Sequence, residues 1–315
     1  MDIKTFQRLP TTEIDRLVRS DGPKVCVFPI NGTRRWFLLE HPPQRAEDLV
    51  PMYLDAIIRR HIDICKLFFD HGLDTLLAPC WGPDIMERGE EYMHMAAEGL
   101  TALATHPAYL DFFEEYSVRV RFYGDYRKFL GQTRHVYLFD QFEEVTARTR
   151  AHDRRRLFIG LFAHDATETV AEIAVEFYRQ NGRPPDKAEI VEAYYGEHVG
   201  AVDLFIGFDK FSAFDMPLVT TGHEDLYFTV SPSPYMSKRQ LRAILYDHLY
   251  ARRGGPDYSA MDAADRAMMR DFYRANLEST MGIGTRHKGI WYPLPQLRLP
   301  AGFVEFIQRD SNQSE

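Results

Sequence analysis

The sequence is poor in cysteine, with three in 315 residues, and none of them forms a CxxC pair. Cys26 and Cys80 stand in apolar runs, where cysteine packs as a small hydrophobic side chain. The odd number and the missing pair motif are typical of reduced, mostly buried thiols in a cytosolic protein. The same pattern argues against a metal-binding or nucleophilic cysteine.

Long apolar runs and excess positive charge are also absent. No stretch approaches the ~18 residues that cross a bilayer, and residues 1–15 contain no signal-peptide core. There are 38 Lys and Arg against 46 Asp and Glu, so the formal net charge is −8. Nucleic acid is therefore not expected as a partner, because it needs a broad basic face. We expect a soluble cytoplasmic protein, which a local arginine cluster still allows to bind an anionic small molecule.

Short apolar runs alternate with longer segments of helical periodicity. The runs are residues 24–30, 73–79, 118–123, 156–162, 203–206 and 225–230. The helical segments are residues 48–70, 84–105, 166–180, 186–198, 237–252 and 262–277. Ser237 and Asp262 are candidate N-caps, and two prolines precede Asp186. The alternation predicts an α/β fold with an open, mostly parallel six-stranded sheet flanked by helices. We expect one catalytic domain, 1–292, and a C-terminal tail, 293–315.

The first apolar run ends in a glycine turn that carries two arginines, Arg34 and Arg35. Ligands of open parallel sheets bind beyond the C-terminal ends of the strands, where this turn lies. Arginine forks match phosphate oxygens, and the N–H groups of a glycine turn add further donors. The turn therefore predicts an anion site; the alternative is a surface hairpin with two solvated arginines.

Ordered motifs along the chain resemble the cis-prenyltransferase family, whose first turn has the pattern D-G-N-x-R-W. The matching segments are PKVCVFPINGTRRWF (23–37), RFYGDYRK (121–128), EAYYGEHV (192–199), DLFIGFDKFSAFDMPL (203–218) and LYFTVSPSPYM (226–236). The similarity is greatest to a side branch, the tuberculosinol and kolavelool synthases, and it extends from about residue 20 to residue 292.

The resemblance implies a diterpene synthase that ionises a bicyclic C20 allylic diphosphate of the halimane or clerodane type. A class II diterpene cyclase would supply this isoprenoid diphosphate. We expect water to capture the cation, giving a kolavelool-like or tuberculosinol-like alcohol and pyrophosphate. Two alternatives are transfer of the diterpenyl group to a nucleoside such as adenosine, and a non-catalytic subunit. The family also implies Mg²⁺ and a homodimer.

The resemblance assigns site residues one by one. Arg35 matches the family's diphosphate-binding arginine, and Lys210 and Ser212 fall where the family has R-x-S. The residues assigned to the diphosphate are Gly32, Thr33, Arg34, Arg35, Lys210 and Ser212. Tyr53 and Tyr92 are assigned catalytic roles, because aromatic faces stabilise cations. The pocket wall is assigned to Trp36, Trp81 and His164.

The sequence departs from the family at two positions. Gly207 replaces the first arginine of the fifth motif, which makes a second diphosphate site and chain elongation doubtful. Asn31 replaces the family's metal-binding aspartate, and an amide is a weaker ligand for Mg²⁺. Either Asp225 holds the metal, or the diphosphate holds it while Asn31 orients a water, or the protein is catalytically silent. Asn31 is kept as a catalytic candidate.

Three further features have two interpretations each. Asp84, with Glu87, is either a metal ligand or an acid that complements a helix dipole. His164 and Asp165 form either a structural pair or part of the pocket. The basic run 147–156 is either a solvated loop or a mobile flap over an anionic substrate.

Overall fold

A six-stranded parallel sheet forms the centre of the molecule, with the strand order β3-β4-β2-β1-β5-β6. The computed structural model describes residues 1–42, 49–209, 211–254, 258–294 and 297–303. The strands are β1 (Val25–Val27), β2 (Thr75–Trp81), β3 (Val118–Tyr123), β4 (Arg155–Leu161), β5 (Leu204–Phe208) and β6 (Asp225–Thr229). Each overlaps one of the six apolar runs, so the expected α/β class and open parallel sheet are confirmed.

Side chains of the central strands alternate between two separate hydrophobic cores. In β1, Cys26 faces the larger core, whereas Val25 and Val27 face the smaller one. Because both faces of the strand are covered, every residue in it is apolar, and the alternation of a half-exposed strand is missing.

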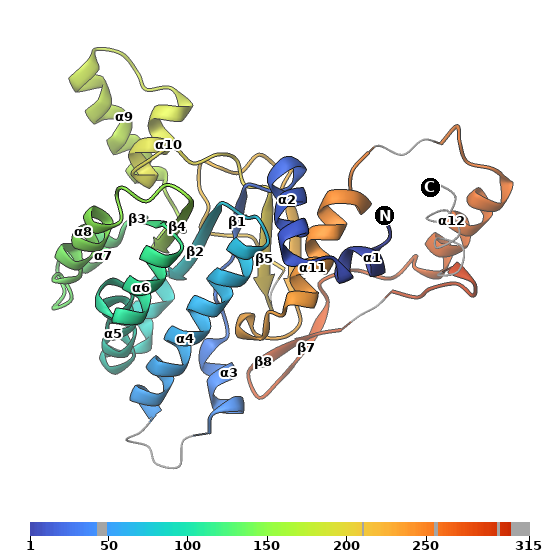
Figure 1. Cartoon of the computed structure of the whole chain (residues 1–315), viewed down its shortest axis with the longest axis horizontal. Helices are drawn as coiled ribbons and strands as arrows, with labels where there is room; N and C mark the ends of the chain where they lie inside the picture. Colours follow the sequence, from blue (N-terminus) through green and yellow to red (C-terminus); the bar gives the residue numbers. More distant parts are fainter. Residues whose placement is uncertain (43–48, 210, 255–257, 295–296, 304–315) are drawn as a thin grey trace.

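Helices from both ends of the chain cover the larger core (Figure 1). They are α1 (Ile3–Arg8), α2 (Thr11–Asp21), α4 (Leu49–Asp70), α5 (Glu90–Thr105), α6 (Pro107–Glu115), α7 (Tyr126–Leu130), α8 (Leu138–Arg148) and α11 (Lys238–Tyr246). The long helices α4 and α5 match expected segments, whereas the shorter ones between residues 107 and 148 were not foreseen. Ser237 caps α11 as expected, through a hydrogen bond from the backbone N–H of Gln240.

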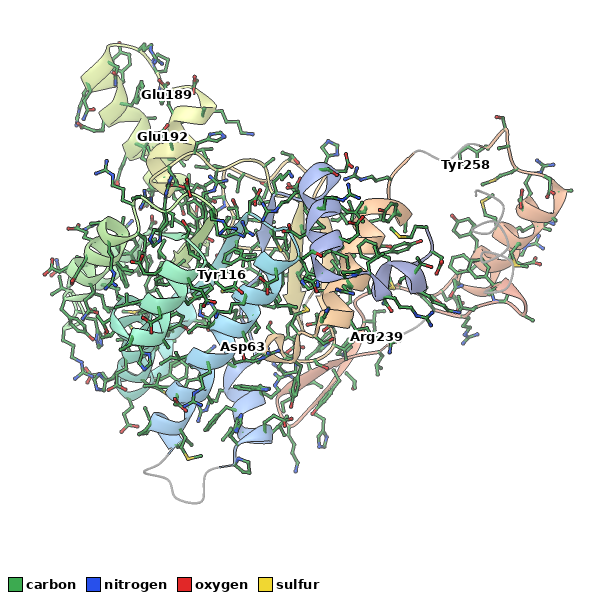
Figure 2. All side chains as sticks on the ribbon, in the orientation of Figure 1. Asp63, Tyr116, Glu189, Glu192, Arg239 and Tyr258 are labelled. Carbon is green, nitrogen blue, oxygen red and sulfur yellow. The ribbon has the colours of Figure 1, made fainter. Side chains whose placement is uncertain are left out.

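The smaller core lies on the opposite face of the sheet. There α10 (Lys187–Tyr195) contributes Val191, Tyr194 and Tyr195, whereas α9 (Thr167–Asn181) buries no residue. The α9–α10 pair projects from the body, and Glu189 and Glu192 lie in this lobe (Figure 2).

The C-terminal segment stands apart from the sheet. Helix α12 (Ala263–Ala275) begins at its expected cap, Asp262, and a hairpin of β7 (Gly284–His287) and β8 (Ile290–Pro293) follows it. Figure 1 shows α12 away from the body, and the exposed Tyr258 lies in the same part of the molecule (Figure 2). The expected boundary at residue 292 falls within β8, and residues 295–296 and 304–315 of the expected tail lie outside the described residues.

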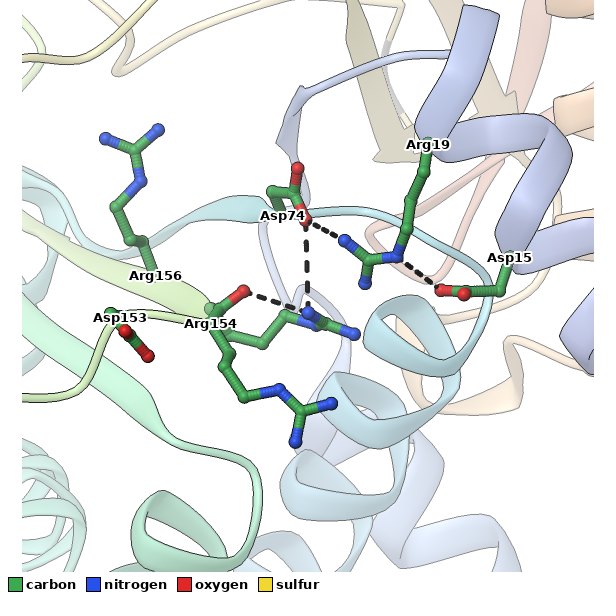
Figure 3. Close-up of a pocket in the computed structure, with 7 residues that line it drawn as sticks. Asp15, Arg19, Asp74, Asp153, Arg154 and Arg156 are labelled. Atoms are coloured by element: carbon green, nitrogen blue, oxygen red, sulfur yellow. Dashed lines mark hydrogen bonds and ion pairs between the residues drawn. The ribbon is translucent and has the colours of Figure 1, made fainter.

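The basic run 147–156 lies at the N-terminal edge of the sheet, where β4 begins (Figure 3). Arg19 pairs there with Asp74 at 2.7 Å and with Asp15 at 2.9 Å, and Arg155 lies 3.9 Å from Asp74. Ligands of such sheets bind at the opposite edge. Of the arginines in the run, Arg155 joins this network and Arg156 lies 3.7 Å from Glu197. The flap interpretation needs correction, because this part of the run lies at the edge of the sheet opposite the expected site.

Among the described residues, no helix is both long enough and apolar enough to span a membrane.

Candidate active site

The turn after β1 places a helix N-terminus at the C-terminal edge of the sheet. Gly32 has a positive φ of 74°, and a Cβ there would lie 2.7 Å from the ring of Phe208. Only glycine fits this backbone and this contact. Helix α3 (Thr33–Glu40) starts directly afterwards, so Arg35 belongs to its first turn. The N–H groups of that turn and the helix dipole favour an anion.

A cavity of about 610 Å³ opens beside this helix start. It lies at the ends of β2 and β5, and its volume is in the range of small-molecule sites. Expected site residues that line it are Asn31, Gly32, Thr33, Arg35, Trp81, Asp84, Tyr92, His164 and Ser212. Lining residues that the sequence analysis did not select are Ile30, Pro79, Cys80, Gly82, Ile85, Arg88, Phe208, Asp209, Phe214 and Asp215. Lys210 lies outside the described residues.

Arg34 and Trp36 do not line this cavity, and their expected roles stay predictions. Successive helical residues point about 100° apart, and Arg35 alone of the three is directed to the cavity. Arg34 is exposed. Trp36 is buried and packs edge-on against His41, with ring centroids 5.2 Å apart.

Arg35 contacts an acid that the sequence analysis did not select. Its Nη2 lies 3.4 Å from Oδ2 of Asp209, and its guanidinium lies over the ring of Phe208. The other carboxylate oxygen, Oδ1 of Asp209, is buried and has no hydrogen-bond partner among the described residues. Asp209 also has a φ of +72°, a conformation that is costly for a residue with a side chain. An unpaired buried oxygen on a residue with a positive φ makes Asp209 a candidate functional residue.

The two tyrosines occupy different places. Tyr92 lines the cavity, and its hydroxyl accepts a hydrogen bond from Nη1 of Arg88 at 3.0 Å. Tyr53 does not line the cavity, and its hydroxyl lies 2.7 Å from the hydroxyl of Thr33. Burial raises the pKa of Tyr53, so its phenol stays protonated at neutral pH. Tyr53 is thus in a position to orient Thr33 rather than to face the cavity.

The carboxylate of Asp84 forms an ion pair with an arginine. Its Oδ2 lies 2.5 Å from Nη2 of Arg88, four residues along the 3₁₀ turn Pro83–Arg88. The described residues contain no group of three or more His, Cys, Asp or Glu that could hold a metal ion. Asp84 lines the cavity, but its charge is already matched.

Asp225 needs correction as a metal ligand of this site. It is the first residue of β6, at the N-terminal edge of the sheet, whereas the cavity lies at the C-terminal edge. Its carboxylate pairs with Nδ1 of His248 at 2.7 Å and with Nη1 of Arg252 at 3.3 Å. These contacts give Asp225 a structural role at the start of its strand.

His164 and Asp165 do not pair with each other. Asp165 accepts hydrogen bonds from the backbone N–H and the hydroxyl of Thr167 at the start of α9. His164 lines the cavity instead, close to the carboxyl of Asp215. Burial, the largest influence, raises the pKa of Asp215 to about 6; His164 opposes the rise and Asp84 adds to it.

The packing around Gly207 leaves no room for the family's arginine. A Cβ at this position would lie 2.8 Å from the ring of Phe205 and 3.0 Å from the ring of Phe228. Both rings belong to strands of the sheet, so they cannot move aside without disturbing it. An arginine at this position would require repacking of these rings, and the lack of the second diphosphate site of chain-elongating members stays a prediction.

Two known proteins align with nearly the whole chain. It is 44% identical to tuberculosinyl adenosine transferase of Mycobacterium tuberculosis over 292 residues, which are 92% of this chain and 97% of that protein. It is 22% identical to (+)-kolavelool synthase of Herpetosiphon aurantiacus over 293 residues, which are 91% of this chain and 94% of that one. No family model matches the chain.

Solved structures share the fold at low identity. Lavandulyl diphosphate synthase from Lavandula x intermedia, in complex with dimethylallyl diphosphate, has a TM-score of 0.59 at 14% identity and covers 74% of this chain and 97% of that one. A probable undecaprenyl diphosphate synthase from Campylobacter jejuni has a TM-score of 0.53 at 13% identity, covering 73% and 97%. Together with the similarity to tuberculosinyl adenosine transferase, the shared fold shows that this chain belongs to the diterpene-related branch of the cis-prenyltransferase family.

Proposed function

We propose that this protein ionises an allylic C20 diphosphate and transfers the diterpenyl group to a nitrogen of a nucleoside, with adenosine as the first candidate. The observation that carries the proposal is the cavity itself, in which Arg35 and the α3 N-terminus form one side. The 44% identity to tuberculosinyl adenosine transferase favours this transfer over the capture by water that the sequence analysis expected.

The proposed reaction begins with departure of the leaving group. The C–O bond to the diphosphate breaks, and the pyrophosphate leaves with the bonding electrons. Arg35, the N–H groups at the start of α3 and the hydroxyl of Ser212 stabilise the negative charge that develops there. Thr33, held by Tyr53, adds a further hydroxyl at this end.

The remaining allylic cation needs walls that do not react with it. Trp81 and Phe208 supply aromatic surface to the cavity, and Ile30 and Ile85 supply aliphatic surface. Aromatic faces attract cations through their quadrupole. These side chains therefore hold the carbon skeleton next to the diphosphate and keep bulk water away from it.

Mg²⁺ is the metal that we propose for the diphosphate. Such ions are commonly held by one or two carboxylates together with substrate phosphates. The residues present fit this arrangement, because Oδ1 of Asp209 is buried and has no partner among the described residues, and Asn31 offers an amide oxygen in the same cavity. When bound, the ion would neutralise charge on the leaving pyrophosphate.

Capture of the cation by water is the second candidate reaction. The similarity to (+)-kolavelool synthase supports it, at half the identity. Either reaction needs an allylic diphosphate with a preformed ring system, and we propose a class II diterpene cyclase as its source. We also propose a homodimer, supported by apolar side chains exposed near α12, among them Tyr273, Leu277 and Met281.

A substrate panel tests whether the protein is an enzyme of this class. Linear and bicyclic C15 and C20 diphosphates are incubated with the full chain, Mg²⁺ and adenosine, and pyrophosphate release is measured alongside mass spectrometry of the products. We expect turnover with a bicyclic C20 diphosphate. No pyrophosphate release from any member of the panel would favour a non-catalytic subunit instead.

A further inference from the structure

We propose that the part of the cavity around Asp215 is the acceptor subsite, and that its carboxylate receives an N–H group of a neutral nitrogen heterocycle. The inference rests on the proposed function and extends it by naming the residue that selects the acceptor. Asp215 lies in the connection between β5 and β6, and it lines the same cavity as Arg35 and Trp81.

The backbone around Asp215 is held firmly in place. Its carbonyl oxygen accepts a hydrogen bond from the hydroxyl of Tyr123 at 2.8 Å. The next residue, Met216, is buried, and the preceding Phe214 packs edge-on against Phe205. Asp215 itself has a φ of +55°, which most residues with a side chain avoid. The fold thus fixes a strained acid at the cavity wall, as binding sites commonly do.

The Asp215 carboxylate has no bound partner in the part of the chain that the structure describes. Among the described residues, none forms a hydrogen bond or ion pair with this carboxylate, although the side chain is half-buried. Arg35 contacts Asp209 and Arg88 contacts Asp84, so the nearest arginines of the cavity are engaged with other acids. A half-buried carboxylate without a protein donor is available to accept a hydrogen bond from a ligand in the cavity.

The charged and titratable groups near Asp215 come from every neighbouring element. Asp84 lies on the 3₁₀ turn, His164 follows β4, and Cys80 belongs to β2. Tyr123 of β3 and the α10 tyrosines, Tyr194 and Tyr195, complete the set. Burial raises the pKa of the Asp215 carboxyl to about 6, so it is ionised at neutral pH and becomes neutral below that value.

The negative charge of the Asp215 carboxylate selects the chemical class of the acceptor. A second diphosphate would be repelled by the acids of this wall, and the position of the family's arginine is filled by Gly207. A heterocycle with an amino group carries no charge and donates N–H bonds, which a carboxylate accepts strongly. Trp81 adds an aromatic wall for a planar ring in the same cavity.

The carboxylate of Asp215 also favours formation of the C–N bond. The lone pair of a ring nitrogen attacks the allylic cation, and the new C–N bond leaves a positive charge on the heterocycle. An ionised Asp215 that holds the neighbouring N–H group stabilises this charge. The proton stays on the heterocycle, and pyrophosphate leaves as the counter-product, so atoms and charges balance.

The test compares Asp215→Asn with Glu192→Gln, which removes one charge from an exposed residue on α10. Adenosine binding is measured by calorimetry on the full chain, and KM for adenosine, kcat and the share of nucleoside adduct are measured with a bicyclic C20 diphosphate. We expect Asp215→Asn to weaken adenosine binding and raise KM about tenfold, because a charge-assisted bond is lost. Glu192→Gln should match the wild type. Equal adenosine affinity in Asp215→Asn and wild type would overturn the proposal.

The pH dependence gives a second readout. In the wild type, adenosine binding should weaken as the pH falls through about 6, because the carboxylate becomes protonated. Asp215→Asn should lose this dependence, whereas His164→Gln should keep it. If His164→Gln abolishes the dependence and Asp215→Asn keeps it, the acceptor contact belongs to the histidine. Binding of adenosine is measured without any diphosphate, so it reports on the subsite even if the proposed reaction fails.

Discussion

Two neighbouring arginines of identical chemistry differ in their surroundings. Arg35 lines the cavity beside Asp209, whereas Arg34 is exposed and does not line it. The sequence could place both at the turn, but it could not say which one faces the ligand. That distinction depends on where α3 begins, because a shift of one residue in the helix start would place Arg34 where Arg35 now lies.

Replacing Arg35 by Ala should lower kcat by about 10²-fold or more, because a preorganised cation at the leaving group is lost. Arg34→Ala is the matched control and should lose less than about tenfold. Steady-state pyrophosphate release at saturating substrate measures both. Near-normal kcat in Arg35→Ala, or equal losses in the two variants, would contradict the assignment.

Replacing Asn31 by Asp should raise the affinity for Mg²⁺, because a carboxylate is a better ligand for this hard cation than an amide. The affinity is measured by calorimetry with an unreactive thio-analogue of the substrate bound. Asp209→Asn should change it in the opposite direction. An unchanged Mg²⁺ affinity in both variants would place the metal away from this edge of the sheet.

The acids of the cavity show the limit of sequence reasoning at the residue scale. Asp209 and Asp215 stand in a motif that the sequence analysis quoted, yet neither was selected. Their importance comes from a positive φ, a buried oxygen and a missing partner, none of which has a sequence signature. An acid directly before Lys210 in a phosphate-binding motif was the one available hint.

At the scale of elements, the strands were predictable and the shorter helices were not. A strand covered on both faces is a continuous apolar run, so each of the six could be found. Helices α6, α7 and α8 span five to eleven residues and lie close together, and their short periodic patterns merge. The assignment of Asp225 as a metal ligand was wrong for a related reason. Its strand was predicted correctly, but Asp225 begins that strand and so lies at the N-terminal edge of the sheet.

Helix α4 contains a buried histidine that should make the protein sensitive to acid. His61 donates or accepts one hydrogen bond with Tyr109, and its Nε2 has no partner among the described residues. Burial lowers the pKa of His61 to about 4. Between pH 6.5 and 4, the His61 imidazole therefore binds a proton in the unfolded chain but not in the folded chain. The free energy of unfolding consequently decreases as the pH falls through this range.

His61→Gln should reduce this sensitivity, because glutamine can still bond to Tyr109 but does not titrate in this range. Between pH 7 and 4.5 the wild type should lose about 2 kcal/mol more of its free energy of unfolding than the variant. Urea denaturation at the two pH values measures the difference. Parallel losses in both proteins would show that His61 is protonated in the fold or exposed.

At the scale of the whole molecule, apolar side chains gather on the C-terminal segment. Tyr273, Leu277 and Met281 are each more than 60% exposed. Exposed apolar patches of this kind commonly mark contacts between proteins. This surface could not be predicted from net charge and length, because it depends on the position of α12 away from the sheet.

Replacing Leu277 by Asp should convert the proposed homodimer into monomers without unfolding them, because a charge is placed in the apolar contact. Val175→Asp, on the exposed face of α9, is the control and should leave the mass unchanged. Light scattering after gel filtration measures the mass. A wild-type protein that is monomeric at all concentrations would refute the dimer.

The central claim is that the cavity passes a diterpenyl cation to a nucleoside. One measurement tests it most directly: the product ratio when the full chain, Mg²⁺ and a bicyclic C20 allylic diphosphate react with adenosine in ¹⁸O-labelled water. The account predicts that a diterpenyl-adenosine adduct predominates and that its share increases with adenosine concentration. Labelled diterpene alcohol as the main product at saturating adenosine would contradict it.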